Sequence, residues 1–256
     1  MEMLNPHCGI SRDDRGVVRL AVCNAGSLNI LSSAVTDSVR AGFEKLAGDR
    51  SVRVVILTGQ SEKSMIGGAD IREMVTLEQK SAEAFITRLR DLCEAVRHFP
   101  APVIARLPGW CLGGGLEVAA ACDVRIAAHD AKFGMPEVKV GIPSVIHAAL
   151  LPRLIGVGRA RYLVMTAENI DAPTALAWGL VDKVAPPGGL DDAVEHTVKA
   201  LLECGAEALR IQKELCRGWD ELPLAESVNR SIGEFGKSFL SGEPQRMLGG
   251  FVNRKR

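Results

Sequence analysis

The sequence has no excess of charge and few aromatic residues. Lysine and arginine together number 31, aspartate and glutamate also number 31, and aromatic side chains make up 4% of the chain. A protein built mainly to coat nucleic acid needs a positive excess, or basic residues interleaved with aromatic ones on which bases stack. The composition therefore argues against a nucleic-acid partner.

The seven cysteines do not form a recognisable pattern. They are scattered, odd in number and often placed inside apolar runs, and no two have Cys-x-x-Cys spacing. This arrangement argues against a disulfide framework and gives no support to a cysteine zinc site. We expect no metal and a reducing compartment.

Long hydrophobic runs are also missing. No apolar stretch approaches the roughly 18 residues of a membrane span. The first residues carry an early acid, Glu2, and a proline, Pro6, where a signal peptide needs basic and then apolar residues. We expect a soluble, cytoplasmic protein without a membrane partner.

Three common glycine motifs are absent. The dinucleotide fingerprint Gly-x-Gly-x-x-Gly fails after Gly113, where Val118 takes the closing position, and after Gly156, where Arg161 takes it. No phosphate loop ending in Gly-Lys-Ser/Thr occurs, and no Gly-x-Ser-x-Gly elbow of a serine hydrolase. The sequence therefore gives no support to a nucleotide-binding protein or a serine hydrolase of the usual kinds.

The order of the elements predicts an α/β fold. The 256 residues are 47% hydrophobic, enough for a full core. Strand signals, strongest over 52–58, alternate with helical periodicity such as that over 77–98 and a helix expected over 145–154. After the Pro-Pro-Gly-Gly break that ends at Gly189, only helices are expected. We predict a core over 1–189 and a helical C-terminal region over 190–256.

Two glycine segments remain to be explained, Gly67-Gly68 and Gly113–Gly115, and each follows a strand and precedes a helix. Such a position directs unscreened backbone N–H groups and the positive end of a helix dipole at a ligand. Two separate N–H sources can hold one oxygen as an oxyanion hole. The alternative is that both segments are simple tight turns.

Two glutamates accompany these glycines. Glu117 falls in the first helical turn after the triple glycine, and Glu137 follows twenty residues later, after Pro136. Carboxylates brought to one place can divide general-acid and general-base work. Read singly, Glu117 can be a helix N-terminal charge and Glu137 a solvated loop residue.

Taken together, these segments resemble the crotonase (enoyl-CoA hydratase/isomerase) family. The resemblance covers nearly the whole chain and is weakest at the C-terminal end. The segments that carry it are Met65–Met74, Pro102–Ala119, Cys122-Asp123, Phe133–Glu137, Leu151–Gly156 and Ala177–Asp182. It implies a spiral of ββα units with a helical C-terminal region that trimerises, so that a homotrimer or a homohexamer is expected.

The resemblance also implies a site for an acyl-CoA substrate, with coenzyme A as part of the substrate and no separate cofactor. The thioester carbonyl is expected between the backbone N–H groups of Gly67 and Gly114. The coenzyme A moiety is expected along the residues of two turns: Ser27, Leu28, Gly68, Ala69, Asp70 and Ile71. Relatives of the hydratase type use two glutamates, whose counterparts are Glu117 and Glu137.

We therefore predict a hydro-lyase that adds water reversibly across the 2,3 double bond of an enoyl-CoA, within fatty acid metabolism. The alternatives are another reaction of the family (isomerisation, thioester hydrolysis or dehydration of a hydroxyacyl-CoA) and, from another class, a non-catalytic CoA- or RNA-binding protein. One segment departs from the family: Ile146 and His147 stand where hydratases have a glycine pair beside the catalytic water. His147 is a possible site residue, or an ordinary packed histidine.

Overall fold

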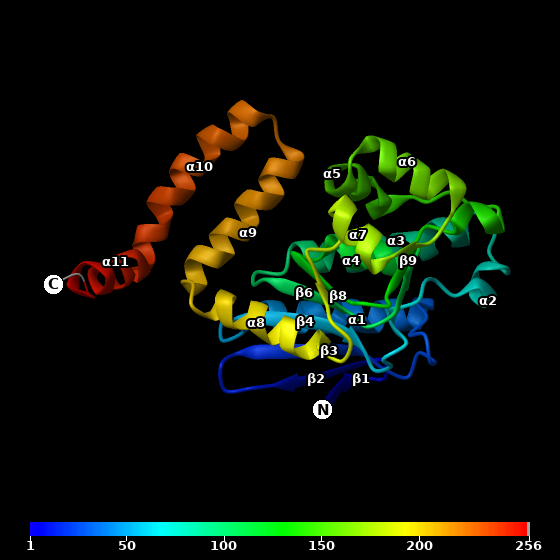
Figure 1. Cartoon of the computed structure of the whole chain (residues 1–256), viewed down its shortest axis with the longest axis horizontal. Coiled ribbons are helices and arrows are strands. Elements are labelled where there is room, and N and C mark those ends of the chain that lie inside the picture. The colour runs from blue at the N-terminus through cyan, green and yellow to red at the C-terminus, as the bar shows by residue number, and fades with distance from the viewer. Residues whose placement is uncertain (255–256) are drawn as a thin grey trace.

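The computed structural model describes residues 1–254, in which two β-sheets are flanked by helices (Figure 1). The larger sheet has the strand order β1 (Glu2–Asn5), β2 (Cys8–Arg12), β3 (Val17–Val22), β4 (Val54–Gly59), β6 (Val103–Leu107), β8 (Val124–Ala128) and β11 (Lys183–Ala185). The smaller sheet has the order β10 (Ile170–Asp171), β9 (Lys132–Gly134), β7 (Trp110–Leu112) and β5 (Ser64–Ile66). The larger sheet is parallel from β3 to β11, and the smaller is parallel from β5 to β9.

Helices account for most of the remaining chain. The α-helices are α1 (Ser33–Ala47), α2 (Ile71–Met74), α3 (Gln79–Arg97), α4 (Gly114–Ala121), α5 (Leu151–Ile155), α6 (Val157–Thr166), α7 (Ala172–Trp178), α8 (Leu190–Leu202), α9 (Ala206–Glu221), α10 (Leu224–Ser238) and α11 (Glu243–Arg254). Residues 1–254 also contain the short 3₁₀ helices η1 (Glu137–Val140), η2 (Ile146–Leu150) and η3 (Phe239–Ser241). The predicted α/β fold with a helical C-terminal region is confirmed.

Both faces of the larger sheet are covered at β4, whose first four residues are all apolar. Val55 and Leu57 belong to the cluster that includes the apolar faces of α1 and α3. Val54 and Ile56 point to the other face and pack with residues of α8. Burial on both sides explains the run of four apolar residues in this parallel strand.

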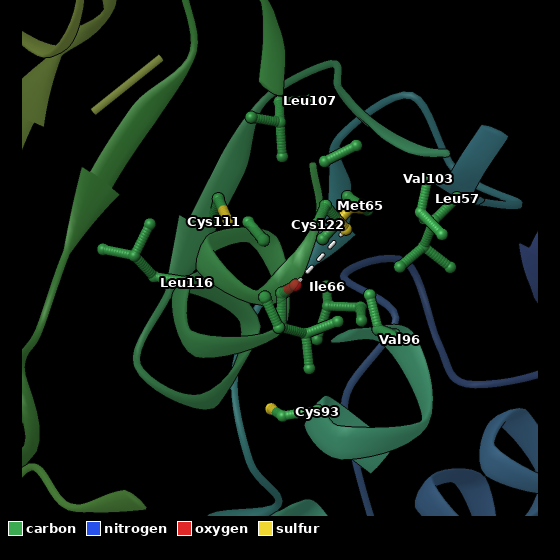
Figure 2. Packing of buried hydrophobic residues seen from close by; sticks show 14 of the residues in the cluster. Leu57, Met65, Ile66, Cys93, Val96, Val103, Leu107, Cys111, Leu116 and Cys122 are labelled. Atoms are coloured by element: carbon green, nitrogen blue, oxygen red, sulfur yellow. Dashed lines mark hydrogen bonds between the residues drawn. The ribbon is translucent and has the colours of Figure 1, made fainter. Parts of the chain in front are cut away.

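Helix α4 lies at the centre of the molecule, and all of its residues are buried. Figure 2 shows the apolar side chains that surround it, including Met65 and Ile66 of β5 and Cys93 and Val96 of α3. A helix in which five of eight residues are glycine or alanine and only Glu117 is charged suits such a position, because neighbouring elements can approach it closely.

The C-terminal helices differ in how they meet the sheets. Helix α8 packs against β4, β6, β8 and β11, whereas α9, α10 and α11 extend away to one side (Figure 1). Several apolar side chains on α10 are exposed, among them Leu224, Ile232 and Phe235, as is Leu240 of η3. No helix in residues 1–254 is long and apolar enough to cross a membrane.

The prediction of a single helix over 145–154 is wrong. Val145 is extended and Ile146 has a positive φ of 37°, so the chain turns there, forms η2 and only then enters α5. Hydrophobic spacing does not reveal a turn of this kind, because the residues on either side of it are apolar whether or not the helix is interrupted. The turn matters for the site, because the Ala148 N–H that follows it donates to Glu117.

Candidate active site

The two glycine segments meet at one edge of the smaller sheet. Strands β5 and β7 are parallel neighbours, so the turns after them, Gly67-Gly68 and Gly113–Gly115, emerge side by side. A Cβ atom added to Gly115 would come within 2.1 Å of the Ile66 carbonyl oxygen, and one added to Gly68 would lie 3.4 Å from that of Leu112. Glycine is required at position 115 because two stretches of backbone touch there.

Replacing Gly115 with alanine is expected to lower the free energy of unfolding by about 2–3 kcal/mol, because the new methyl group meets backbone that cannot rotate away. The matched control is Gly158→Ala in α6, where an added Cβ meets nothing within 4 Å. That change is expected to be neutral or to stabilise the protein by up to about 1 kcal/mol. Urea unfolding of both variants measures the difference, and equal stabilities would contradict the close approach.

The predicted coenzyme A residues lie together along the turn before α1. The Leu31 N–H donates to the Gly68 carbonyl and the Asp70 N–H donates to the Leu31 carbonyl, both at 2.9 Å, and Ala69 forms a bridge with Leu31. Ser27, Leu28 and Ile71 are exposed beside them. The Asp70 side chain accepts from the backbone N–H groups of α2, as a helix cap.

The two predicted oxyanion donors are placed differently. The Gly114 N–H opens the first turn of α4, where no intrahelical carbonyl is available to accept it. The Gly67 N–H donates to the Leu28 carbonyl over 2.7 Å. A ligand oxygen that takes both N–H groups therefore has to replace the Leu28 carbonyl at Gly67.

Glu117 is a buried carboxyl group in the first turn of α4. Its side chain accepts the Ala148 N–H at 2.9 Å, and the residue is only 3% exposed. Burial raises the pKa of Glu117 to about 8, and the negative charge of Glu137 acts in the same direction. The Ala148 hydrogen bond opposes this shift, because it favours the ionised form.

Glu137 begins η1 and lies against the triple glycine. A Cβ atom on Gly113 would come within 2.3 Å of its Oε1 atom, so the glycine leaves the space that this carboxyl group occupies. The Ser144 hydroxyl donates to Glu137 Oε2 at 2.9 Å. Burial raises the pKa of Glu137 as well, against the effect of Ser144. Glu137 is thus half-buried and hydrogen-bonded.

The structure brings Glu117, Glu137 and the Gly113–Gly115 turn to one place, and it shows two partners that the sequence did not reveal. These are Ser144 and the Ala148 N–H, which depend on how residues 138–148 fold back over α4. Burial raises the pKa of both the buried Glu117 and the half-buried Glu137, as suits carboxyl groups that hold and release protons in a reaction. The site therefore has two carboxyl groups suited to acid–base chemistry beside the Gly113–Gly115 turn.

His147 faces away from this pair toward α3. Its Nε2 atom lies 2.8 Å from Oε1 of Glu94, and the residue is 7% exposed. Burial lowers the pKa of His147, against the effect of Glu94. Within residues 1–254, no group of three or more His, Cys, Asp or Glu side chains is arranged to hold a metal ion.

Comparison with known proteins gives consistent matches. Residues 12–256 match the family described as enoyl-CoA hydratase/isomerase. The chain is 32% identical over 231 residues to the short-chain-enoyl-CoA hydratase of Clostridium acetobutylicum, covering 90% of this chain and 88% of that protein. The crotonyl-CoA hydratase of Syntrophomonas wolfei is 32% identical over 231 residues, with 90% and 89% covered. A crystal structure of enoyl-CoA hydratase from Mycobacterium smegmatis has a TM-score of 0.93 at 28% identity, covering 98% of this chain and 97% of that one.

Proposed function

Because the chain belongs to the enoyl-CoA hydratase/isomerase family and is an enzyme of the enoyl-CoA hydratase type, we propose that Glu117 and Glu137 add water reversibly across the 2,3 double bond of a short-chain enoyl-CoA. The fold is that of crotonase-type hydratases. The observation that carries the assignment of roles is the convergence of the buried Glu117 and the half-buried Glu137 carboxyl groups on the Gly113–Gly115 turn.

The proposed mechanism starts at the thioester carbonyl. Backbone N–H groups of Gly114 and Gly67 polarise this oxygen, which makes C3 electrophilic and stabilises the enolate that forms on attack. Glu117 orients the water and takes its proton, while Glu137 delivers a proton to C2. The pKa of Glu117, about 8, lets this carboxyl group gain and lose a proton near neutral pH, and the raised pKa of Glu137 favours the protonated form that a proton donor needs.

We propose that coenzyme A, as part of the substrate, lies along the exposed turn that contains Ser27 and Leu28 and along residues 68–71. Hydrogen bonds hold these two segments side by side. Asp70 already caps α2 with its carboxylate, so its contribution is assigned to the backbone. The Leu28 carbonyl leaves the Gly67 N–H when the thioester enters.

The preference for a short acyl chain rests on the relatives named for short-chain and crotonyl substrates. It is tested by hydration rates of enoyl-CoA thioesters from four to sixteen carbons, measured in both directions by ultraviolet absorbance. We expect kcat/KM for the four-carbon substrate to exceed that for the sixteen-carbon one by about tenfold or more. Hydrolysis or isomerisation of the panel without hydration would contradict the proposed reaction.

We also propose that copies of the chain assemble through the C-terminal helices, as a homotrimer or as two stacked trimers, in the cytoplasm. The exposed apolar side chains of α10 support an interface between copies, because surface patches of this kind mark association sites. All seven cysteines are free thiols, in keeping with a reducing compartment.

A further inference from the structure

The turn that begins η2 has a costly backbone conformation. Ile146 has φ of +37°, in the left-handed region that a β-branched residue rarely adopts. Such a conformation persists only where the surrounding contacts fix it. Its two neighbours along the chain, Val145 and His147, differ in exposure: Val145 is 39% exposed, and His147 is buried.

Two hydrogen bonds follow directly after this strained residue. Nε2 of His147 lies 2.8 Å from Glu94 Oε1 on α3, and the next residue, Ala148, donates its N–H to Glu117 Oε1 on α4 at 2.9 Å. A carboxylate can only accept, so the histidine Nε2 carries the hydrogen and donates it. The histidine and the amide thus attach one turn to two helices.

We propose that His147 is a positioning residue: its bond to Glu94 holds the left-handed turn at Ile146 and thereby keeps the Ala148 N–H on Glu117. The catalytic consequence rests on the proposed function, whereas the positioning itself does not. His147 is not a catalytic residue, because its polar contact is to α3 rather than to either glutamate of the site.

Few charged groups surround the contact between His147 and Glu94. Glu94 also contacts Arg97, the last residue of α3, at 3.5 Å and His98, the residue that caps the helix, at 3.1 Å. Arg97 and Arg90 act on the pKa of His147, each lowering it. No hydrogen-bond partner occurs for the buried Nδ1 of His147 among residues 1–254, so the Nε2 contact is the polar anchor of this side chain.

The Glu117 end of the turn has its own charged and titratable neighbours. Glu137, at the start of η1, raises the pKa of Glu117, and Cys93 of α3 is close enough for the Glu117 charge to raise the pKa of its thiol. The hydrogen bond from the Ala148 N–H favours the ionised form of Glu117. If this bond is lost, the pKa of Glu117 is expected to rise further.

The test compares three variants of the full-length protein. His147→Ala removes the anchor, and kcat is expected to fall by about 10- to 100-fold with little change in KM. His98→Ala removes a half-exposed histidine from the same Glu94 carboxylate, and kcat is expected to stay within about twofold of the wild type. Adding Ile146→Gly to His147→Ala is expected to recover most of the lost kcat, because glycine adopts the positive φ without an anchor.

A second readout does not need activity. The titration of the Glu117 carboxyl group is followed by carbon NMR of protein labelled at the glutamate Cδ, and its signal is identified by its loss in Glu117→Gln. The pKa of Glu117 is expected to rise in His147→Ala and to stay unchanged in His98→Ala. If His147→Ala fails to fold, Glu94→Ala breaks the same contact from its half-exposed side, with the same expected shift.

The outcomes separate the two proposals. A wild-type Glu117 titration in the variants that lack the contact would overturn the positioning role, even if kcat fell. A shifted titration in a protein that hydrates no enoyl-CoA would support the positioning role and overturn the proposed reaction. Failure of Ile146→Gly to restore kcat and the titration would also contradict the part assigned to backbone strain.

Discussion

Replacing Glu137 with glutamine is expected to lower kcat by about 10²–10⁴-fold while leaving KM for the thioester nearly unchanged. Glutamine has the same shape and can still accept the Ser144 hydroxyl, so the turn around η1 should persist. It cannot carry a proton to and from C2. The measurement is the steady-state hydration of the four-carbon enoyl-CoA, followed by loss of absorbance of the conjugated thioester.

Ser144→Ala is the matched control for this change. It removes the hydroxyl that donates to Glu137 but leaves the carboxyl group in place, so kcat is expected to fall by no more than about tenfold. Loss of this hydrogen bond should raise the pKa of Glu137 further, since Ser144 lowers it. Near-normal turnover in Glu137→Gln, or equal losses in the two variants, would contradict the role of Glu137 in proton transfer.

Much of the framework could be predicted because it follows from local sequence. The strand signal over 52–58 predicted β4 to within two residues, and helical spacing predicted α3 over 77–98, observed as Gln79–Arg97. The glycine segment gave the start of α4 at Gly114. In each case, a residue's own chemistry and that of its near neighbours decide the structure.

The contacts that complete the site could not be predicted, because they join segments by tertiary folding. The Ala148 bond to Glu117 follows the turn at Ile146, where the hydrophobic pattern predicts helix, and the Ser144 bond to Glu137 depends on the loop between η1 and η2. The bond from the Gly67 N–H to the Leu28 carbonyl depends on how the turn before α1 folds onto β5. The glycine and glutamate positions are visible in sequence, whereas their hydrogen-bond partners are not.

Replacing Glu117 with glutamine is expected to reduce activity and to stabilise the protein at alkaline pH. The pKa of this carboxyl group is about 8 in the folded chain and ordinarily 4.5, so the folded state binds a proton that the unfolded state has lost. Stability contributed by this group therefore falls as pH rises from 4.5 to 8, by about 3 kcal/mol between pH 5 and pH 8. Glutamine can still accept the Ala148 N–H without this dependence.

Urea unfolding of wild type and Glu117→Gln at pH 5 and pH 8 measures the difference, with Glu203→Gln at the exposed end of α8 as the control. The Glu117→Gln variant should lose less stability on raising the pH than either of the other two proteins. Its kcat is expected to fall by about 10²–10⁴-fold, because the water loses its base. Parallel stability curves for all three proteins would mean that Glu117 is not held protonated by burial. A Glu117→Gln variant that is more stable at pH 8 but inactive would show that burial of the Glu117 carboxyl group lowers stability and that catalysis needs this group.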